Sequence, residues 1–119
     1  MRRFLLTLVV LGLIVAALGL YLTRPRADGP EVLAGLTGDV EAGRLVFTAA
    51  GCASCHAAEG ATGDAKLLLT GGQHFPSPFG TFTAPNISMD PEHGIGGWSA
   101  LDLWNALRHG TSPEGQHYY

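Results

Sequence analysis

The stretch Gly51-Cys52-Ala53-Ser54-Cys55-His56 decides how the rest of this chain is interpreted. Two thiols separated by two residues can each add to one vinyl group of a haem, and a histidine directly after the second thiol is then held beside the iron as an axial ligand. We therefore expect covalently attached haem c, with Cys52 and Cys55 as the thioether positions. His56 is the expected proximal ligand of the iron.

Other functions of a Cys-x-x-Cys pair fit this sequence less well than haem attachment. A zinc site needs a second pair of ligands at matching spacing, and the four remaining histidines are scattered without a partner cysteine. A redox disulfide of the thioredoxin type should follow a buried strand, whereas residues 39–50 have the pattern of a helix. A plain structural disulfide between Cys52 and Cys55 would fit an exported domain but leaves His56 unexplained.

The composition indicates one small acidic domain with an apolar appendage. The chain has 119 residues, of which 46% are hydrophobic, and many of these lie near the N-terminus. From Ala27 onward, three basic side chains stand against ten acidic ones, a formal charge of roughly −7, so we expect no nucleic-acid partner. Seventeen glycines indicate many turns and a thin protein core. A covalently held porphyrin would supply a large apolar centre for such a domain.

An N-terminal membrane anchor is expected over residues 1–23. Phe4–Leu22 contains no charged residue, and a helix of that length spans roughly 28 Å, close to the thickness of a bilayer core. A cleaved signal peptide is the alternative, because residues 17–19 (Ala-Leu-Gly) could form a small-x-small cleavage site.

The charges that flank the apolar stretch suggest its orientation. Arg2 and Arg3 favour a cytoplasmic N-terminus, although Arg24 and Arg26 on the other side weaken this argument. We expect a single-pass protein of the bacterial cytoplasmic (inner) membrane, with its haem domain on the periplasmic side. Residues 24–37, rich in proline and glycine, are predicted to form a linker.

The haem domain is predicted to occupy residues 38–119 and to be all-α with long loops. A first helix should begin after Asp39 as N-cap and end at Gly51, directly before the haem motif. A second helix is predicted over residues 99–109, where apolar residues recur at helical spacing. The glycine- and proline-rich segment 57–86 is predicted to be loop, with at most a short turn around Ala65–Leu69.

The motifs around the Cys-x-x-Cys-His stretch resemble the class I cytochrome c fold. Gly43-x-x-x-Phe47 precedes the haem motif, as in the N-terminal helix of that fold. More specifically, the chain resembles the membrane-bound cytochrome c subunits of periplasmic alcohol, aldehyde and gluconate dehydrogenases. The resemblance covers roughly Gly38 to Tyr119 and rests on Ala84-Pro85-Asn86-Ile87-Ser88, Asp90-Pro91, Gly94-Ile95-Gly96, Trp98-Ser99 and Ala106-Leu107-Arg108 with Gly110.

The resemblance implies parts that this sequence lacks. In class I cytochromes a methionine after the second helix binds the iron from the sixth position, and a final helix follows, but this sequence stops at Tyr119 before either. Related subunits also often repeat the haem domain, so we expect a truncated sequence. The sixth ligand stays open between a residue outside the chain, an empty position, Met89, and the histidines His74, His93, His109 and His117.

The expected function is electron transfer rather than catalysis. The resemblance implies a periplasmic dehydrogenase as donor and an oxidase or quinone-linked acceptor in the respiratory chain. The alternative is a haem enzyme or gas sensor, in which an open sixth coordination site binds a small molecule.

Overall fold

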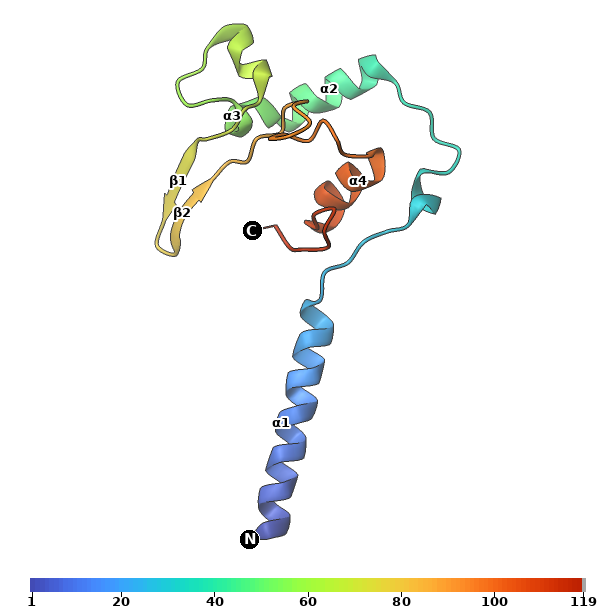
Figure 1. The fold of residues 1–119 in the computed structure, drawn as a ribbon, viewed down its shortest axis with the longest axis vertical. Coiled ribbons are helices and arrows are strands. Elements are labelled where there is room, and N and C mark those ends of the chain that lie inside the picture. Colours follow the sequence, from blue (N-terminus) through green and yellow to red (C-terminus); the bar gives the residue numbers. More distant parts are fainter. Residues whose placement is uncertain (119) are drawn as a thin grey trace. The chain divides into compact units, whose positions relative to one another are not determined.

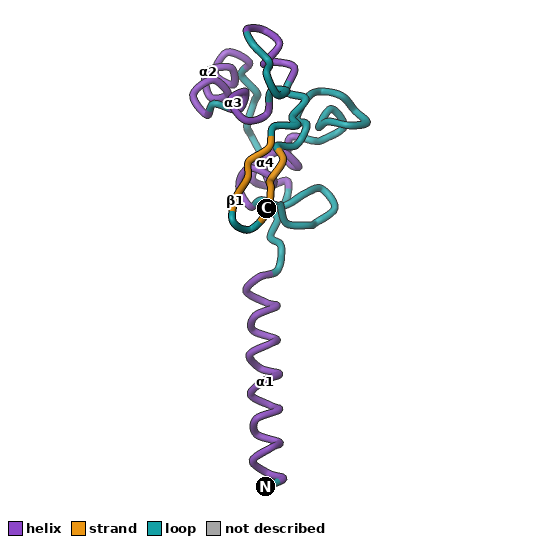
Figure 2. The backbone as a smooth tube through the Cα atoms, turned by 90° about the vertical axis from the view of Figure 1, so that its left-hand side faces the viewer, coloured by secondary structure: helices purple, strands orange, loops and turns teal. Residues whose placement is uncertain are grey.

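The computed structural model describes residues 1–118, and the elements are helices of different lengths with one hairpin between them (Figure 1; Figure 2). They are α1 (Arg2–Thr23), the 3-10 helix η1 (Pro30–Leu33), α2 (Val40–Ala50), α3 (Cys52–His56), the 3-10 helix η2 (Gly63–Leu68), β1 (His74–Ser77), β2 (Gly80–Thr83) and α4 (Ala100–His109). The chain divides into two compact units. Residues 1–32 and 100–119 form the anchor unit, and residues 33–99 form the motif unit.

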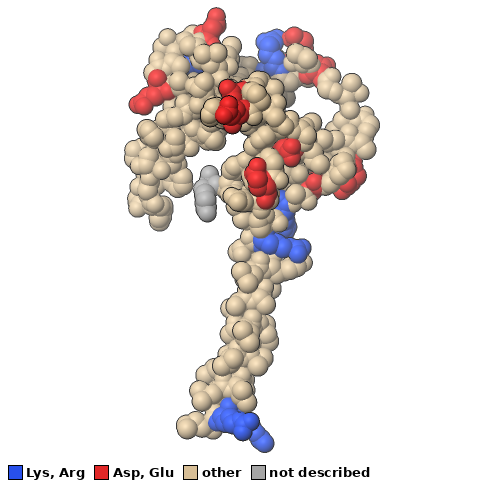
Figure 3. Space-filling model, in the orientation of Figure 1, with Lys and Arg blue, Asp and Glu red and all other residues tan. Residues whose placement is uncertain are grey.

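Helix α1 confirms the helix predicted around Phe4–Leu22 and extends it slightly at both ends. It is 22 residues long, or about 33 Å, and has a mean hydropathy of 2.7. None of its residues is buried. Figure 3 shows no charged side chain along its visible face between basic groups at the two ends. By length and composition, α1 can cross a bilayer.

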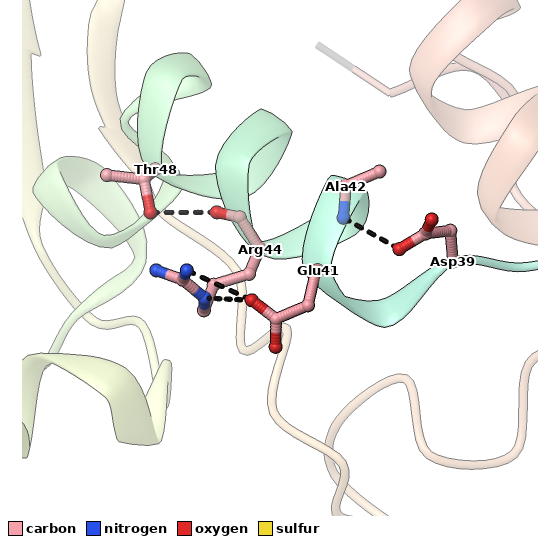
Figure 4. A network of polar contacts seen from close by, with 5 residues as sticks. All are labelled: Asp39, Glu41, Ala42, Arg44 and Thr48. Atoms are coloured by element: carbon pink, nitrogen blue, oxygen red, sulfur yellow. Dashed lines mark hydrogen bonds and ion pairs between the residues drawn. The ribbon is translucent and has the colours of Figure 1, made fainter.

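Helix α2 begins and ends where the sequence predicts. The Asp39 side chain accepts a hydrogen bond from the Ala42 N–H at 2.9 Å and caps the first turn (Figure 4). One turn on, Arg44 and Glu41 form an exposed ion pair at 3.0 Å, which contributes little to stability. The helix ends at Gly51, which adopts a left-handed conformation with φ of 68°.

The hairpin of β1 and β2 departs from the all-α prediction. Figure 2 shows the two strands side by side, and they pair antiparallel, with Phe75 opposite Phe82 and Ser77 opposite Gly80. The sequence indicated only loop here, because each strand has four residues and Pro76 interrupts the first. A turn closed by the Ser77 hydroxyl, which donates to the Gly80 carbonyl at 2.7 Å, holds the strands together. The fold is therefore helix-rich but not all-α.

The segment predicted as a linker, residues 24–37, is bound in part to α4. The Asn105 side chain, which is buried, accepts from the Asp28 N–H at 2.7 Å and donates to the Asp28 carbonyl at 3.2 Å. The buried Thr111 hydroxyl donates to the Arg26 carbonyl at 2.7 Å. These contacts replace the backbone partners that an extended segment would otherwise find in water. Residues 26–28 thus form part of the anchor unit.

Candidate functional site

The haem motif lies on a single helical turn directly after α2. The Gly51 N–H donates to the Thr48 carbonyl at 3.1 Å, and the Gly51 carbonyl accepts from the Ser54 N–H at 2.9 Å and from its hydroxyl at 2.6 Å. Gly51 thereby closes one helix and opens the next, so that Cys52 and Cys55 lie three residues apart on α3. That spacing places both thiols on one side of the turn.

The two cysteines have the accessibility that their predicted role needs. Both are free thiols, with Cys52 partly buried and Cys55 exposed. A vinyl group of a porphyrin can reach thiols at the surface, whereas a pair locked in a disulfide cannot react. The structure therefore brings together two reactive groups and His56 within five consecutive residues.

The ring of His56 is held in the orientation and tautomer that an iron ligand needs. Its Nδ1 lies 2.9 Å from the Pro85 carbonyl oxygen. A carbonyl can only accept, so Nδ1 is the donor, and in the neutral ring Nε2 then keeps its lone pair for a metal. A metal-binding histidine usually donates a hydrogen bond to such an acceptor from the ring nitrogen that does not bind the metal. In the sequence, Pro85 stood out only as part of a resemblance, and this role was missed.

Backbone contacts fix α3 against the chain that follows it. The His56 carbonyl accepts from the Gly71 N–H at 2.7 Å. The Gln73 side-chain amide donates to the carbonyls of Ser54 at 3.2 Å and Ala57 at 3.1 Å. These bonds satisfy carbonyl groups at the C-terminal end of a helix that is too short to satisfy them itself. The position of Gln73 in the fold, rather than any motif, identifies it as a support of the site.

Position 71 requires a glycine, because residues 84 and 85 pass close to its backbone. It is buried, has φ of 69°, and a Cβ on it would lie 2.6 Å from the Ala84 carbonyl oxygen and from the carbonyl carbon and oxygen of Pro85. Only glycine combines that conformation with so close an approach. Gly71 thus lets the Pro85 carbonyl reach His56.

The apolar side chains of the motif unit fit a large apolar prosthetic group. Among the described residues of this unit, the buried hydrophobic side chains are small, Ala57 and Ala84. Larger ones are exposed, including Leu67, Leu68 and Phe82. A unit that buries so little apolar surface from its own side chains lacks the usual driving force for folding, and a porphyrin would supply it.

The candidates for the sixth iron position are dispersed. Met89 is 78% exposed in the loop before α4. Each of the four histidines contacts another protein group. His74 Nδ1 lies 3.0 Å from the Thr83 hydroxyl, His93 Nδ1 3.6 Å from Asp90, His109 Nε2 2.9 Å from Asp28, and His117 Nε2 2.8 Å from the Thr23 carbonyl. In residues 1–118 no three His, Cys, Asp or Glu side chains gather as a metal site.

Curated proteins that match this chain include several cytochromes. A protein named diheme cytochrome c-type from Cereibacter sphaeroides is 58% identical over 119 residues, covering 100% of this chain and 40% of the relative. The cytochrome c subunit of a quinone-dependent alcohol dehydrogenase from Gluconobacter oxydans is 36% identical over 80 residues, covering 67% of the chain and 16% of the relative. The cytochrome subunit of a fructose dehydrogenase from Gluconobacter japonicus is 35% identical over 80 residues, again covering 67% and 16%.

These relatives confirm the resemblance to c-type cytochromes that was stated from the sequence. No protein-family model matches the chain. The chain spans well under half of the length of each of these relatives. Together with the Cys-x-x-Cys-His motif on α3, the relatives confirm haem c as the cofactor.

Proposed function

We propose that this relative of c-type cytochromes carries one haem on Cys52, Cys55 and His56 and transfers single electrons between redox proteins. The observation that supports the proposal most strongly is the geometry of α3. It presents two free thiols and a histidine whose Nε2 is available because the Pro85 carbonyl holds Nδ1 at 2.9 Å.

Attachment needs only addition chemistry from this chain. The Cys52 and Cys55 thiols would each form one C–S bond to a vinyl carbon of the haem, with the thiol proton passing to the neighbouring vinyl carbon, so no oxidant would be consumed. Haem c, when bound, supplies an iron that cycles between its ferric and ferrous forms. His56 would bind the iron through Nε2, and the Pro85 carbonyl at 2.9 Å from Nδ1 would hold its ring in the orientation for this. Gly71 and Gln73 keep that ring and α3 in place.

The protein is proposed to act at a membrane, with its haem domain in the periplasm. Helix α1 is long enough to span, and Arg2 and Arg3 favour a cytoplasmic N-terminus. The predicted division into an anchor over 1–23, a linker over 24–37 and a haem domain over 38–119 is part of this proposal. A class I cytochrome c fold for the haem domain belongs to it as well.

The proposed partners are redox proteins. Two relatives are cytochrome subunits of an alcohol dehydrogenase and a fructose dehydrogenase, and this supports a dehydrogenase as the electron donor. The acceptor would be an oxidase or a quinone-linked component of the respiratory chain. The chain itself would be an electron carrier, with the chemistry on the substrate performed by its partner.

An optical redox titration of the purified holoprotein tests the proposal. A carrier should titrate reversibly as a one-electron couple, and the ferrous form should neither bind carbon monoxide rapidly nor turn over peroxide. Rapid carbon monoxide binding together with sustained peroxide turnover would instead favour the haem enzyme or gas sensor with an open sixth coordination site. The two functions differ in whether the sixth iron position is open to a small molecule, so this measurement separates them directly.

A further inference from the structure

A pocket lies within the anchor unit, next to the end of α1, and the electron-transfer proposal does not use it. Its volume is about 490 Å³. It is lined by the last apolar turn of α1 at Leu22 and by Arg24, Arg26, His109, His117 and Tyr118. Residues from the N-terminal segment and from the chain after α4 meet here, and the His117 ring bonds to the Thr23 carbonyl across the junction.

The lining of the pocket is basic. The Arg24 guanidinium lies 4.4 Å from the centre of the Tyr21 ring, which holds it by a cation–π contact. Among the described residues, the Arg26 guanidinium forms no ion pair, although its backbone carbonyl is bound by Thr111. Figure 3 shows basic side chains gathered at this end of α1. Two arginines at one site favour an anion, and guanidinium groups match the paired oxygens of a phosphate.

Two acidic groups also lie near the pocket, and each has contacts of its own. Asp28 lies 2.9 Å from His109 and accepts from the Trp104 indole N–H at 2.8 Å, so its carboxylate already has partners. Glu114 acts on Tyr118, where burial first and the Glu114 charge second raise the pKa of the phenol. Tyr118 thus adds a phenol side chain, rather than a further charge, to the lining of the pocket.

The position of the pocket relative to α1 indicates the source of the anion. Helix α1 is about 33 Å long, so its two ends would reach the two faces of a bilayer core. Thr23 is its last residue, and the arginines follow at once. Tyr21 and Tyr118 lie at the same end, and tyrosines are enriched at the level of the lipid headgroups. A phosphate that enters this pocket would thus be attached to acyl chains beside Leu22.

From these observations, and on the premise of the proposed membrane attachment, we infer that the pocket binds the phosphate headgroup of an anionic phospholipid in the leaflet where α1 ends. Arg24 and Arg26 are the anion-binding residues, and Tyr118 and His117 complete the lining. This also accounts for arginines on the side of the span where the positive-inside bias does not place them.

Native mass spectrometry of the full holoprotein in a neutral detergent tests the inference. Phosphatidylglycerol and phosphatidylcholine with identical acyl chains are added in equal amounts. We expect bound phosphatidylglycerol to exceed bound phosphatidylcholine by about fivefold or more, since each basic residue near a membrane contributes a factor of that order. The double variant Arg24→Gln, Arg26→Gln should lose this excess, and Arg24→Lys, Arg26→Lys should keep part of it.

The matched control removes the same charge from the other end of α1. Arg2→Gln, Arg3→Gln should keep most of the phosphatidylglycerol excess, and equal losses in both double variants would overturn the inference. Inorganic phosphate at millimolar concentration distinguishes the two sources of the anion. We expect phosphatidylglycerol to stay bound when inorganic phosphate is added. Displacement of the lipid by inorganic phosphate would instead assign the pocket to free phosphate.

Failure of this inference can be told apart from failure of the proposed function. Carbonate extraction of membranes reports whether α1 anchors the chain, and haem retention on a denaturing gel reports attachment. A protein that stays in the membrane with its haem but shows no lipid preference contradicts the headgroup site alone. A protein that carbonate releases contradicts the anchor on which the site depends.

Discussion

At the scale of single residues, the carbonyl of Pro85 determines which nitrogen of His56 can reach an iron. That carbonyl is delivered by a chain passing against Gly71, where a Cβ would lie 2.6 Å from the Pro85 carbonyl. His56 thus depends on a glycine that lies 15 positions later in the sequence. The same glycine also contacts it directly, because the Gly71 N–H donates a hydrogen bond of 2.7 Å to the His56 carbonyl.

Gly71→Ala should therefore destabilise the holoprotein more than Gly72→Ala does. Both glycines have positive φ, at 69° and 93°, so both variants incur a backbone cost of about 1–2 kcal/mol. At Gly72 a Cβ meets nothing within 4 Å, whereas at Gly71 it displaces the chain that supports His56. We expect an additional loss of at least about 1 kcal/mol in Gly71→Ala, measured by urea unfolding. Equal losses in the two variants would contradict the role given to Gly71.

His56→Ala and Met89→Ala should differ sharply in their effect on the haem spectrum. Loss of His56 removes the proximal ligand and should abolish the low-spin spectrum and lower the unfolding free energy by several kcal/mol. Met89 is 78% exposed, so its truncation should change stability by less than about 0.5 kcal/mol. Disappearance of the far-red sulfur–iron band in Met89→Ala would show that Met89 is the sixth ligand.

The cysteines and His56 could be predicted from sequence because their chemistry depends on spacing along the chain. The supports of His56 could not be predicted in this way. Pro85 acts through its backbone carbonyl and Gln73 through bonds to carbonyls of Ser54 and Ala57, and neither contact leaves a pattern of residue types. Gly71 stood among many glycines, and only its close approach to Pro85 distinguishes it.

At the scale of elements, the carboxylate of Asp28 adds to the backbone contacts by which α4 binds the segment that follows α1. Asp28 accepts from the Trp104 indole at 2.8 Å and lies 2.9 Å from His109. The Trp104 hydrogen bond and then the His109 contact lower the pKa of Asp28 below its usual value. A lowered pKa means that the native unit favours the ionised carboxylate.

The sign of the resulting pH dependence follows from linkage. Because the folded pKa of Asp28 is lower than its unfolded pKa, the stabilisation is present above the unfolded value near 3.8 and is lost as the pH falls through the lower folded value. We expect hydrogen exchange at residues 26–28 and in α4 to accelerate in that acid range. Asp28→Asn should remove this pH dependence, whereas Glu31→Gln, at an acid in the same unit, should retain it.

The helices were more predictable than the hairpin because their ends carry chemical signals. Asp39 caps α2 and Gly51 ends it, as predicted, and α4 covers all but the first residue of the range predicted for it. The pairing of β1 with β2 depends on the turn between Ser77 and Gly80, and four-residue strands contain too little alternation to be read from sequence. The contacts of residues 26–28 with α4 depend on partners more than 70 residues away.

At the scale of the whole molecule, the charge of the chain from Ala27 onward should influence encounters with redox partners. Residues from Ala27 onward carry roughly −7, and such charge acts on the rate of encounter over about 8–10 Å at physiological salt. Stopped-flow reduction by a basic soluble cytochrome should therefore slow as salt is raised. We expect no comparable effect within a preassembled dehydrogenase complex. A rate that does not change with salt would mean that the acidic residues lie away from the site of electron exchange.

The measurement that tests the central claim most directly is covalent haem retention. Expressed in full with cytochrome c maturation machinery and run on a denaturing gel, the protein should keep its haem, and Cys52→Ala, Cys55→Ala should lose it. Ser54→Ala, which alters the same turn without removing a thiol, is the control and should retain the haem. Haem that stays covalently bound in the double cysteine variant would contradict the assignment of Cys52 and Cys55.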